Sequence, residues 1–127
     1  ISGIINNAKN HQKVLGFPVL KGDFLENEIL KHAKKQENWE LIKEYHFGGY
    51  GKYTDELIHF INRFKSETDI PLDPIYTGKM MFGIVDMIKK NRFLNGSKIL
   101  IIHSGGLQGI EGFNQRLITK QSGLKIL

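Results

Sequence analysis

Segments with helical and strand periodicity alternate along this sequence, and this order restricts the possible folds more than any other feature. The run KILIIH (98–103) places four apolar residues in succession, which suits a strand covered on both faces. The predicted helices cover residues 1–13, 23–33, 54–66 and 77–91, and the predicted strands cover residues 16–22, 39–45 and 98–103. This alternation favours an α/β fold with an open, mostly parallel sheet and helices on both faces.

The predicted helix starts differ in their capping signals. Asp23 with Glu26 three residues later is shaped like a capping box, and Thr54 followed by two acidic residues is a sound N-cap. Residues 1–13, by contrast, begin at Ile1 without an N-cap. We therefore expect the chain to be the later part of a longer protein.

Composition excludes some classes of protein. The 127 residues suit one domain, and 40% apolar content can build a core. The absence of cysteine excludes disulfides, thiolate catalysis and sulfur-based zinc sites. No apolar run reaches the roughly 18 residues of a membrane span and no signal segment is visible, so we expect a cytoplasmic protein without membrane partners.

The formal net charge is +5, which raises the question of nucleic-acid binding. The cationic clusters fall late in two predicted helices, where positive charge favours the helix end. They are Lys31, Lys34 and Lys35, then Lys89, Lys90 and Arg92. No aromatic platform is interleaved with them, so we expect solvated helix ends and no nucleic-acid partner.

Three glycine-containing segments lie where a parallel sheet binds ligands, beyond the carboxyl ends of its strands. HFGGYG (46–51) and HSGG (103–106) follow predicted strands, and DPIYTGK (73–79) leads into a helix. We expect these loops to face one cleft. Tyr50 lies between two glycines and Tyr76 lies two residues before Gly78, so their rings and hydroxyls are candidates to stack on a planar cofactor or to move protons.

Each of these features also has a simpler interpretation. HSGGLQG could be an ordinary glycine turn, and its glycine spacing is not a dinucleotide fingerprint. The two tyrosines could pack at a rim with their hydroxyls in water. We expect Lys79, a candidate Schiff-base nucleophile, to be a surface or ion-pair residue. His46 and His103 lack metal-ligand spacing, so hydrogen bonding is the expected role.

Together, LDPIYTGKMMFGI, HFGGYGKYT and IIHSGGLQG resemble the pyridoxal-phosphate-dependent family of 1-aminocyclopropane-1-carboxylate deaminase and D-cysteine desulfhydrase. The resemblance covers nearly the whole chain. It implies a sheet of the tryptophan-synthase β type (fold type II), with residues 1–127 forming the later part of the large, cofactor-binding domain. It also implies pyridoxal 5′-phosphate as the cofactor and a small amino acid as the substrate, and it favours a homodimer.

The resemblance assigns roles residue by residue. Tyr76 of the Tyr-Thr-Gly-Lys motif and Tyr50 of the Gly-Gly-Tyr-Gly loop correspond to catalytic tyrosines near the cofactor. Ser104 corresponds to the hydroxyl opposite the pyridine nitrogen, and with Thr77 and Gly105 it forms the expected cofactor-binding set. A hydroxyl is a neutral partner for that nitrogen, so the ring is a milder electron sink than one paired with a carboxylate.

Thr77 separates two branches of the family. The resemblance implies a Tyr-Glu-Gly-Lys motif in ring-opening deaminases, where the glutamate serves the ring nitrogen. Thr77 stands in that place here, which favours a desulfhydrase-like β-elimination of a small D-amino acid, giving an α-keto acid and ammonia. The family's Schiff-base lysine and phosphate loop lie earlier in the protein, so we expect this segment alone to be inactive. The main alternative is a non-catalytic α/β module that binds a phosphate-bearing ligand, and nucleic-acid binding by the basic surface is a third possibility.

Overall fold

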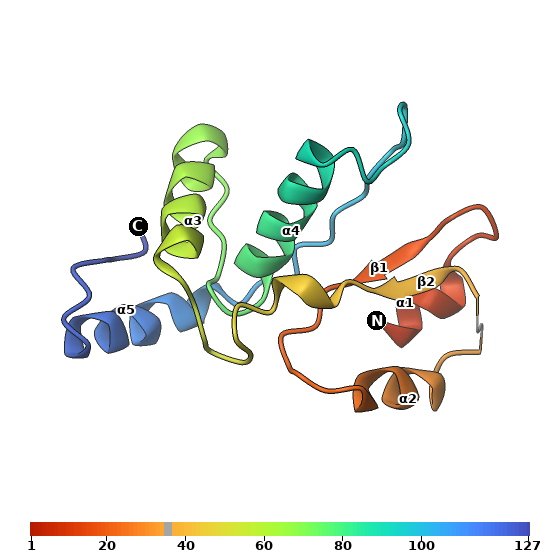
Figure 1. The fold of residues 1–127 in the computed structure, drawn as a ribbon, viewed down its shortest axis with the longest axis horizontal. Coiled ribbons are helices and arrows are strands. Elements are labelled where there is room, and N and C mark those ends of the chain that lie inside the picture. Colours follow the sequence, from red (N-terminus) through yellow and green to blue (C-terminus); the bar gives the residue numbers. More distant parts are fainter. Residues whose placement is uncertain (35–36) are drawn as a thin grey trace.

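The structure, a computed structural model, describes residues 1–34 and 37–127 and places them in two groups of elements (Figure 1). The first group contains helix α1 (Ser2–Asn7), strand β1 (Val14–Gly16), helix α2 (Phe24–Leu30) and strand β2 (Trp39–Leu41). The second contains helices α3 (Asp55–Thr68), α4 (Thr77–Lys89) and α5 (Ile110–Thr119). Two short 3-10 helices, η1 (Lys43–Tyr45) and η2 (Leu107–Gly109), lie in the connections.

The described residues contain one two-stranded sheet, in which β1 and β2 pair in parallel with Leu15 opposite Glu40. The α/β class and the parallel pairing are therefore confirmed at this coarse level. The predicted strand at 16–22 is wrong in position, since only Gly16 lies within β1. Pro18 follows closely and has no N–H for a strand ladder, which limits extension in that direction. The strand predicted at 39–45 ends early, because residues 43–45 turn into η1.

The prediction of a strand at 98–103 is wrong. Residues 98–103 are described, but they form no strand, and Leu100 exposes 87% of its surface. A strand needs hydrogen-bonding partners on a neighbouring segment, and β1 and β2 pair only with each other. The open sheet with helices on both faces is therefore not formed by the described residues.

The main core lies among the three longer helices. Leu57, Ile58 and Ile61 of α3 are buried as the helical spacing predicts, and they pack with residues of α4, α5 and the carboxyl-terminal tail. The Thr54 side chain accepts a hydrogen bond from the Leu57 N–H at 3.3 Å, which confirms the predicted N-cap. Burial of this stripe holds α3 beside α4, as Figure 1 shows.

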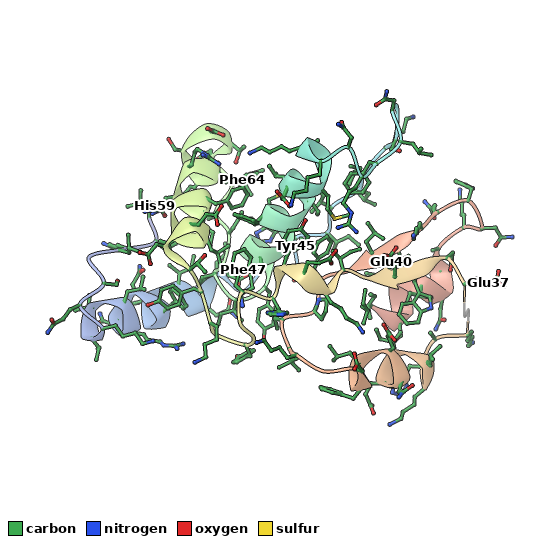
Figure 2. The ribbon with its side chains drawn as sticks, viewed as in Figure 1. Glu37, Glu40, Tyr45, Phe47, His59 and Phe64 are labelled. Atoms are coloured by element: carbon green, nitrogen blue, oxygen red, sulfur yellow. The ribbon has the colours of Figure 1, made fainter. Side chains whose placement is uncertain are left out.

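Aromatic residues connect η1 to the α3–α4 pair. Figure 2 shows Tyr45 and Phe47 reaching from η1 and the turn after it toward α4. The ring centroids of Phe47 and Phe82 are 5.0 Å apart and the rings meet edge to face, the arrangement that aromatic pairs prefer. These contacts fix the start of the loop that carries Tyr50.

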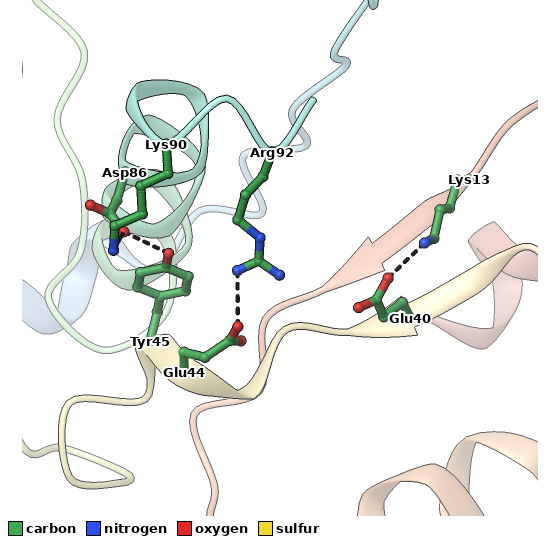
Figure 3. Close-up of polar contacts among 7 residues, drawn as sticks. All are labelled: Lys13, Glu40, Glu44, Tyr45, Asp86, Lys90 and Arg92. Atoms are coloured by element: carbon green, nitrogen blue, oxygen red, sulfur yellow. Dashed lines mark hydrogen bonds and ion pairs between the residues drawn. The ribbon is translucent and has the colours of Figure 1, made fainter. Parts of the chain in front are cut away.

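Polar contacts reinforce the same connection (Figure 3). The Tyr45 hydroxyl donates to the Asp86 carboxylate at 2.7 Å, and Lys90 pairs with Asp86 at 2.6 Å. These two contacts, Lys90 first, lower the pKa of Asp86. Arg92 pairs with Glu44 at 2.9 Å.

Helix ends account for most of the cationic clusters. Lys31 and Lys90 are the C-cap residues of α2 and α4, as the charge pattern predicts, whereas Lys35 lies outside the described residues.

The predicted capping box at Asp23 is wrong in detail. Asp23 is the N-cap of α2 but makes no side-chain cap bond, and its carboxylate instead accepts from Lys43 at 3.2 Å. Within the part of the chain that the structure describes, no helix is long and apolar enough to cross a membrane.

Candidate functional site

The start of α4 is organised by the buried carboxylate of Asp73, which is only 2% exposed. One of its oxygens accepts from the backbone N–H groups of Ile75 and Tyr76 at 2.8 and 2.7 Å. The other accepts from the N–H and the hydroxyl of Thr77 at 2.8 and 2.6 Å. The three N–H donors lie at the start of the helix, where backbone N–H groups lack intrahelical partners and an anion is favoured. The DPIYTGK segment thus holds Tyr76 in a fixed turn.

Tyr50 and Tyr76, the two predicted catalytic residues, lie together. Their ring centroids are 6.1 Å apart with an interplanar angle of 63°, an edge-to-face arrangement. Both side chains remain open to a ligand, with 57% of Tyr50 and 47% of Tyr76 exposed. Interaction with the neighbouring Tyr50 hydroxyl, followed by desolvation, raises the pKa of Tyr76 above its ordinary value.

The HSGG loop, which carries Ser104, is attached to the same region by His103. The Nε2 of His103 lies 2.9 Å from the Pro71 carbonyl oxygen, and the Gly105 N–H donates to Nδ1 at 3.1 Å. A Cβ added at Gly106 would lie 3.0 Å from the Asp73 carboxyl carbon, so this glycine packs directly against the Asp73 side chain. Asp73 therefore lies between the segment of Tyr76 and the loop of Ser104.

The predicted cofactor-binding residues differ in their availability. Ser104 is exposed, and a Cβ at Gly105 would have no atom within 4 Å, so open space adjoins the backbone there. Thr77 is 2% exposed and its hydroxyl is engaged with Asp73. The roles of Ser104, Thr77 and Gly105 toward a cofactor stay predictions.

Lys79 is buried and forms no ion pair with any residue that the structure describes, so the expectation of a surface or ion-pair residue is wrong. Its side chain is 1% exposed, and its amine donates to the carbonyl oxygens of His46 and Gly49 at 2.9 and 2.8 Å. Desolvation lowers the pKa of Lys79 to about 8, and the charge of Asp73 opposes the shift. The periodicity missed this because the lysine belongs to the buried side of α4.

His46 and His103 have the hydrogen-bonding roles that the sequence predicts. The Gly48 N–H donates to Nδ1 of His46 at 2.9 Å, and both ring nitrogens of His103 have partners. The described residues hold no group of three acidic, histidine or cysteine side chains that could bind a metal.

Sequence reasoning did not find Arg116 of α5. Its Nη1 donates to the Gly51 carbonyl oxygen at 2.9 Å, on the loop of Tyr50. The two partners are 65 positions apart in the sequence, so no local signal indicates this contact. A groove between α3 and α4 is lined by residues that include Glu56, His59 and Lys89. None of the predicted site residues lines it.

No family model matches the chain. Individual relatives do. The chain is 31% identical over 121 residues to a Pyrococcus furiosus protein named "Putative 1-aminocyclopropane-1-carboxylate deaminase", covering 87% of this chain and 36% of that protein. It is 41% identical over 78 residues to the Pyrococcus horikoshii protein of the same name, covering 61% and 23%. It is 41% identical over 63 residues to the mitochondrial bifunctional D-cysteine desulfhydrase/1-aminocyclopropane-1-carboxylate deaminase of Arabidopsis thaliana, covering 49% and 16%.

The chain is homologous to proteins of this deaminase and desulfhydrase family. The family suggested by the three motifs is thereby confirmed. Its members named above are longer than this chain, which spans about a third or less of their length. Among the described residues, Tyr50 and Tyr76 form a pair of half-exposed phenols, and their roles in chemistry stay predictions.

Proposed function

We propose that the chain supplies the tyrosine-bearing half of the active site of a pyridoxal-phosphate-dependent enzyme acting on a small amino acid. The supporting observation is the meeting of Tyr50 and Tyr76, half-exposed and edge to face at 6.1 Å, where the start of α4 adjoins the HSGG loop. These segments are far apart in sequence, and the same three motifs carry the family resemblance. The relatives' names supply the reaction class.

The donor set fits the ring of the cofactor. Two phenols and the exposed Ser104 hydroxyl are neutral groups that can face a planar heteroaromatic ring, and the backbone at Gly105 has open space beside it. The lysine amine of Lys79 is committed to two carbonyl oxygens, so it does not fit the role of the Schiff-base group. When bound, pyridoxal phosphate supplies an electron sink for a carbanion at the substrate's α-carbon.

The residues of this chain bind and manage protons around that ring. The Tyr76 hydroxyl, which is a neutral phenol at neutral pH, donates a hydrogen bond or a proton to a substrate atom. The Tyr50 ring holds Tyr76 in that orientation through their edge-to-face contact at 6.1 Å. Ser104 donates to or accepts from the pyridine nitrogen without adding charge.

Within the family, we propose the desulfhydrase-like branch. The resemblance places a glutamate in ring-opening deaminases where this chain has Thr77, so this position supplies no carboxylate to serve the ring nitrogen. The expected reaction is β-elimination from a small D-amino acid such as D-cysteine, which yields an α-keto acid, ammonia and hydrogen sulfide. We also propose that residues 1–127 belong to the later part of the large domain, and that the whole enzyme is a homodimer.

The test is a comparison of two substrates with the full-length protein that contains this chain, loaded with pyridoxal phosphate. Ammonia and α-keto acid are measured with D-cysteine and with 1-aminocyclopropane-1-carboxylate. Release of both products from D-cysteine supports the proposal. Turnover of the cyclopropane substrate alone overturns the branch, and cofactor binding without turnover of either substrate favours the non-catalytic module. Light scattering of the same sample tests the homodimer.

A further inference from the structure

The loop that carries Tyr50 has an unusual backbone. Gly48, Gly49 and Gly51 all have positive φ, at 93°, 120° and 63°, a region that residues with a Cβ rarely adopt. Glycine can adopt many other backbone conformations with little strain, so these residues allow the observed turn but do not favour it over other loop conformations. Some other contact must select one conformation if Tyr50 is to meet Tyr76.

Two cations from different helices contact this loop through its backbone. Lys79 of α4 donates to the carbonyl oxygen of Gly49, the residue before Tyr50, and to that of His46. Arg116 of α5 donates to the carbonyl oxygen of Gly51, the residue after Tyr50. Figure 1 shows the loop between η1 and α3 passing close to the N-terminal end of α4 and to α5.

These contacts are well suited to fixing a position. Hydrogen bonds from charged donors contribute more than neutral ones, and the two that Lys79 makes lie away from water because its side chain is 1% exposed. A Cβ at Gly51 would lie 3.2 Å from Nη1 of Arg116, so the guanidinium sits directly against the loop backbone. Neither cation contacts the Tyr50 ring in the described hydrogen bonds or ring contacts, so each acts through the main chain.

We propose that Lys79 and Arg116 are positioning residues that hold Tyr50 against Tyr76 by fixing the carbonyl groups on both sides of Tyr50 in the sequence. This inference rests on the proposed function for its catalytic consequence, but not for its structural one. Lys79 lies three residues after Tyr76 on the same helix, so one element carries both the catalytic partner and the group that orders the opposite loop. The arrangement couples the placement of the two phenols to the start of α4.

The main test uses Arg116→Gln in the full-length protein, because Arg116 is exposed and its loss should leave the fold intact. Arg63→Gln is the matched control, since Arg63 is an exposed arginine of α3 that pairs with Glu67 of the same helix. Arg116→Lys tests rescue, because an ammonium can still donate to the Gly51 carbonyl. Lys79→Met removes the other contact, and if it fails to fold, the Arg116 variants decide the question.

Two measurements do not depend on activity. The first is amide exchange at Gly49 and Lys52, whose N–H groups are bonded within this turn at 3.0 and 3.1 Å. We expect exchange to rise about 10-fold or more in Arg116→Gln, because the turn opens more often. The second is the nuclear Overhauser effect between the rings of Tyr50 and Tyr76, which we expect to weaken in Arg116→Gln and to persist in Arg63→Gln and Arg116→Lys.

The kinetic measurement separates positioning from a general loss of structure. We expect kcat to fall between about 10- and 100-fold in Arg116→Gln with a smaller change in KM, as misplacement of a reacting group produces. In a Tyr50→Phe background the same substitution should have little further effect. Unchanged exchange and an unchanged ring contact in Arg116→Gln would overturn the positioning role, whatever the activity. If the wild-type protein turns over neither substrate, the proposed function fails while these two measurements still decide the inference.

Discussion

Replacing Asp73 with asparagine separates its two carboxylate oxygens, because an amide keeps one acceptor and replaces the other with a donor. The remaining oxygen can still accept from Ile75 and Tyr76. The new NH₂ group would face the Thr77 N–H, which now donates to the carboxylate at 2.8 Å. Two donors cannot bond to each other, so one buried N–H loses its partner.

The expected cost follows from these contacts. A hydrogen bond to a charged group contributes about 1.5–3 kcal/mol, and an unsatisfied buried donor costs about 1–3 kcal/mol, with overlap between the two figures. We therefore expect Asp73→Asn to lower the free energy of unfolding by about 2–4 kcal/mol. Asp73→Ala removes all four acceptor contacts and should cost about 4 kcal/mol or more.

Urea unfolding followed by circular dichroism measures both variants, with an unchanged slope showing that stability alone has changed. Asp69→Asn is the matched control, because Asp69 is exposed and caps α3 in the left-handed conformation that asparagine tolerates. Its effect should stay within about 0.5 kcal/mol. A cost for Asp73→Asn no larger than that of the control would refute the role given to Asp73.

Three further changes test other parts of the structure. Tyr45→Phe removes the hydroxyl that donates to Asp86 at 2.7 Å and should lower the free energy of unfolding by about 1 kcal/mol; no change in the urea midpoint would show the bond to be dispensable. Gly78→Ala places a Cβ 2.6 Å from a backbone carbonyl oxygen and should cost about 1–3 kcal/mol, whereas Gly112→Ala in α5 meets no atom within 4 Å and should stabilise by up to about 1 kcal/mol. Burial lowers the pKa of Lys79 from 10.5 to about 8, so between these values the unfolded chain holds a proton that the folded chain has released, and the free energy of unfolding should rise with pH in this window. The rise should be smaller in Lys79→Met, and equal slopes in the two proteins would contradict the buried position of Lys79.

The parts of the fold that the sequence predicted well are those with local causes. The Thr54 cap and the stripe of Leu57, Ile58 and Ile61 depend on residues three or four apart, and α3 forms within two residues of its predicted bounds. The strand at 98–103 was predicted from an apolar run alone. Such a run cannot supply the neighbouring strand that pairing needs, and in the structure these residues form a mostly exposed segment without secondary structure.

The candidate site likewise contains residues that the sequence indicated and a residue that it could not place. The glycine-containing motifs GGYG and IYTG indicated Tyr50 and Tyr76 as candidates, and the structure brings their ring centroids to 6.1 Å. Lys79 could not be placed from its sequence position, because its partners are backbone carbonyl oxygens 30 and 33 residues away. Backbone atoms have no residue-type signature, so contacts of this kind leave no pattern to read.

Asp73 shows an intermediate case. The sequence marks it by its place ahead of proline and of the helix, as the first residue of the DPIYTGK motif. Its bonds to Tyr76 and Thr77 are local and could be expected of an acidic residue at a helix start. Its contact with Gly106 of the HSGG loop depends on the tertiary fold, and that contact is what joins two of the three motifs.

A double-mutant cycle on Tyr50 and Tyr76 tests the central claim, that the two phenols act as one unit on a single bound substrate. In the full-length, cofactor-loaded protein, kcat/KM is measured for wild type, Tyr50→Phe, Tyr76→Phe and the double variant, with Tyr53→Phe as a control because Tyr53 packs on Phe113 instead. We expect Tyr76→Phe to lower kcat/KM about 100-fold or more, and the double variant to be little worse than Tyr76→Phe alone. Losses that multiply independently, or a Tyr76→Phe enzyme as active as the wild type, would contradict the account.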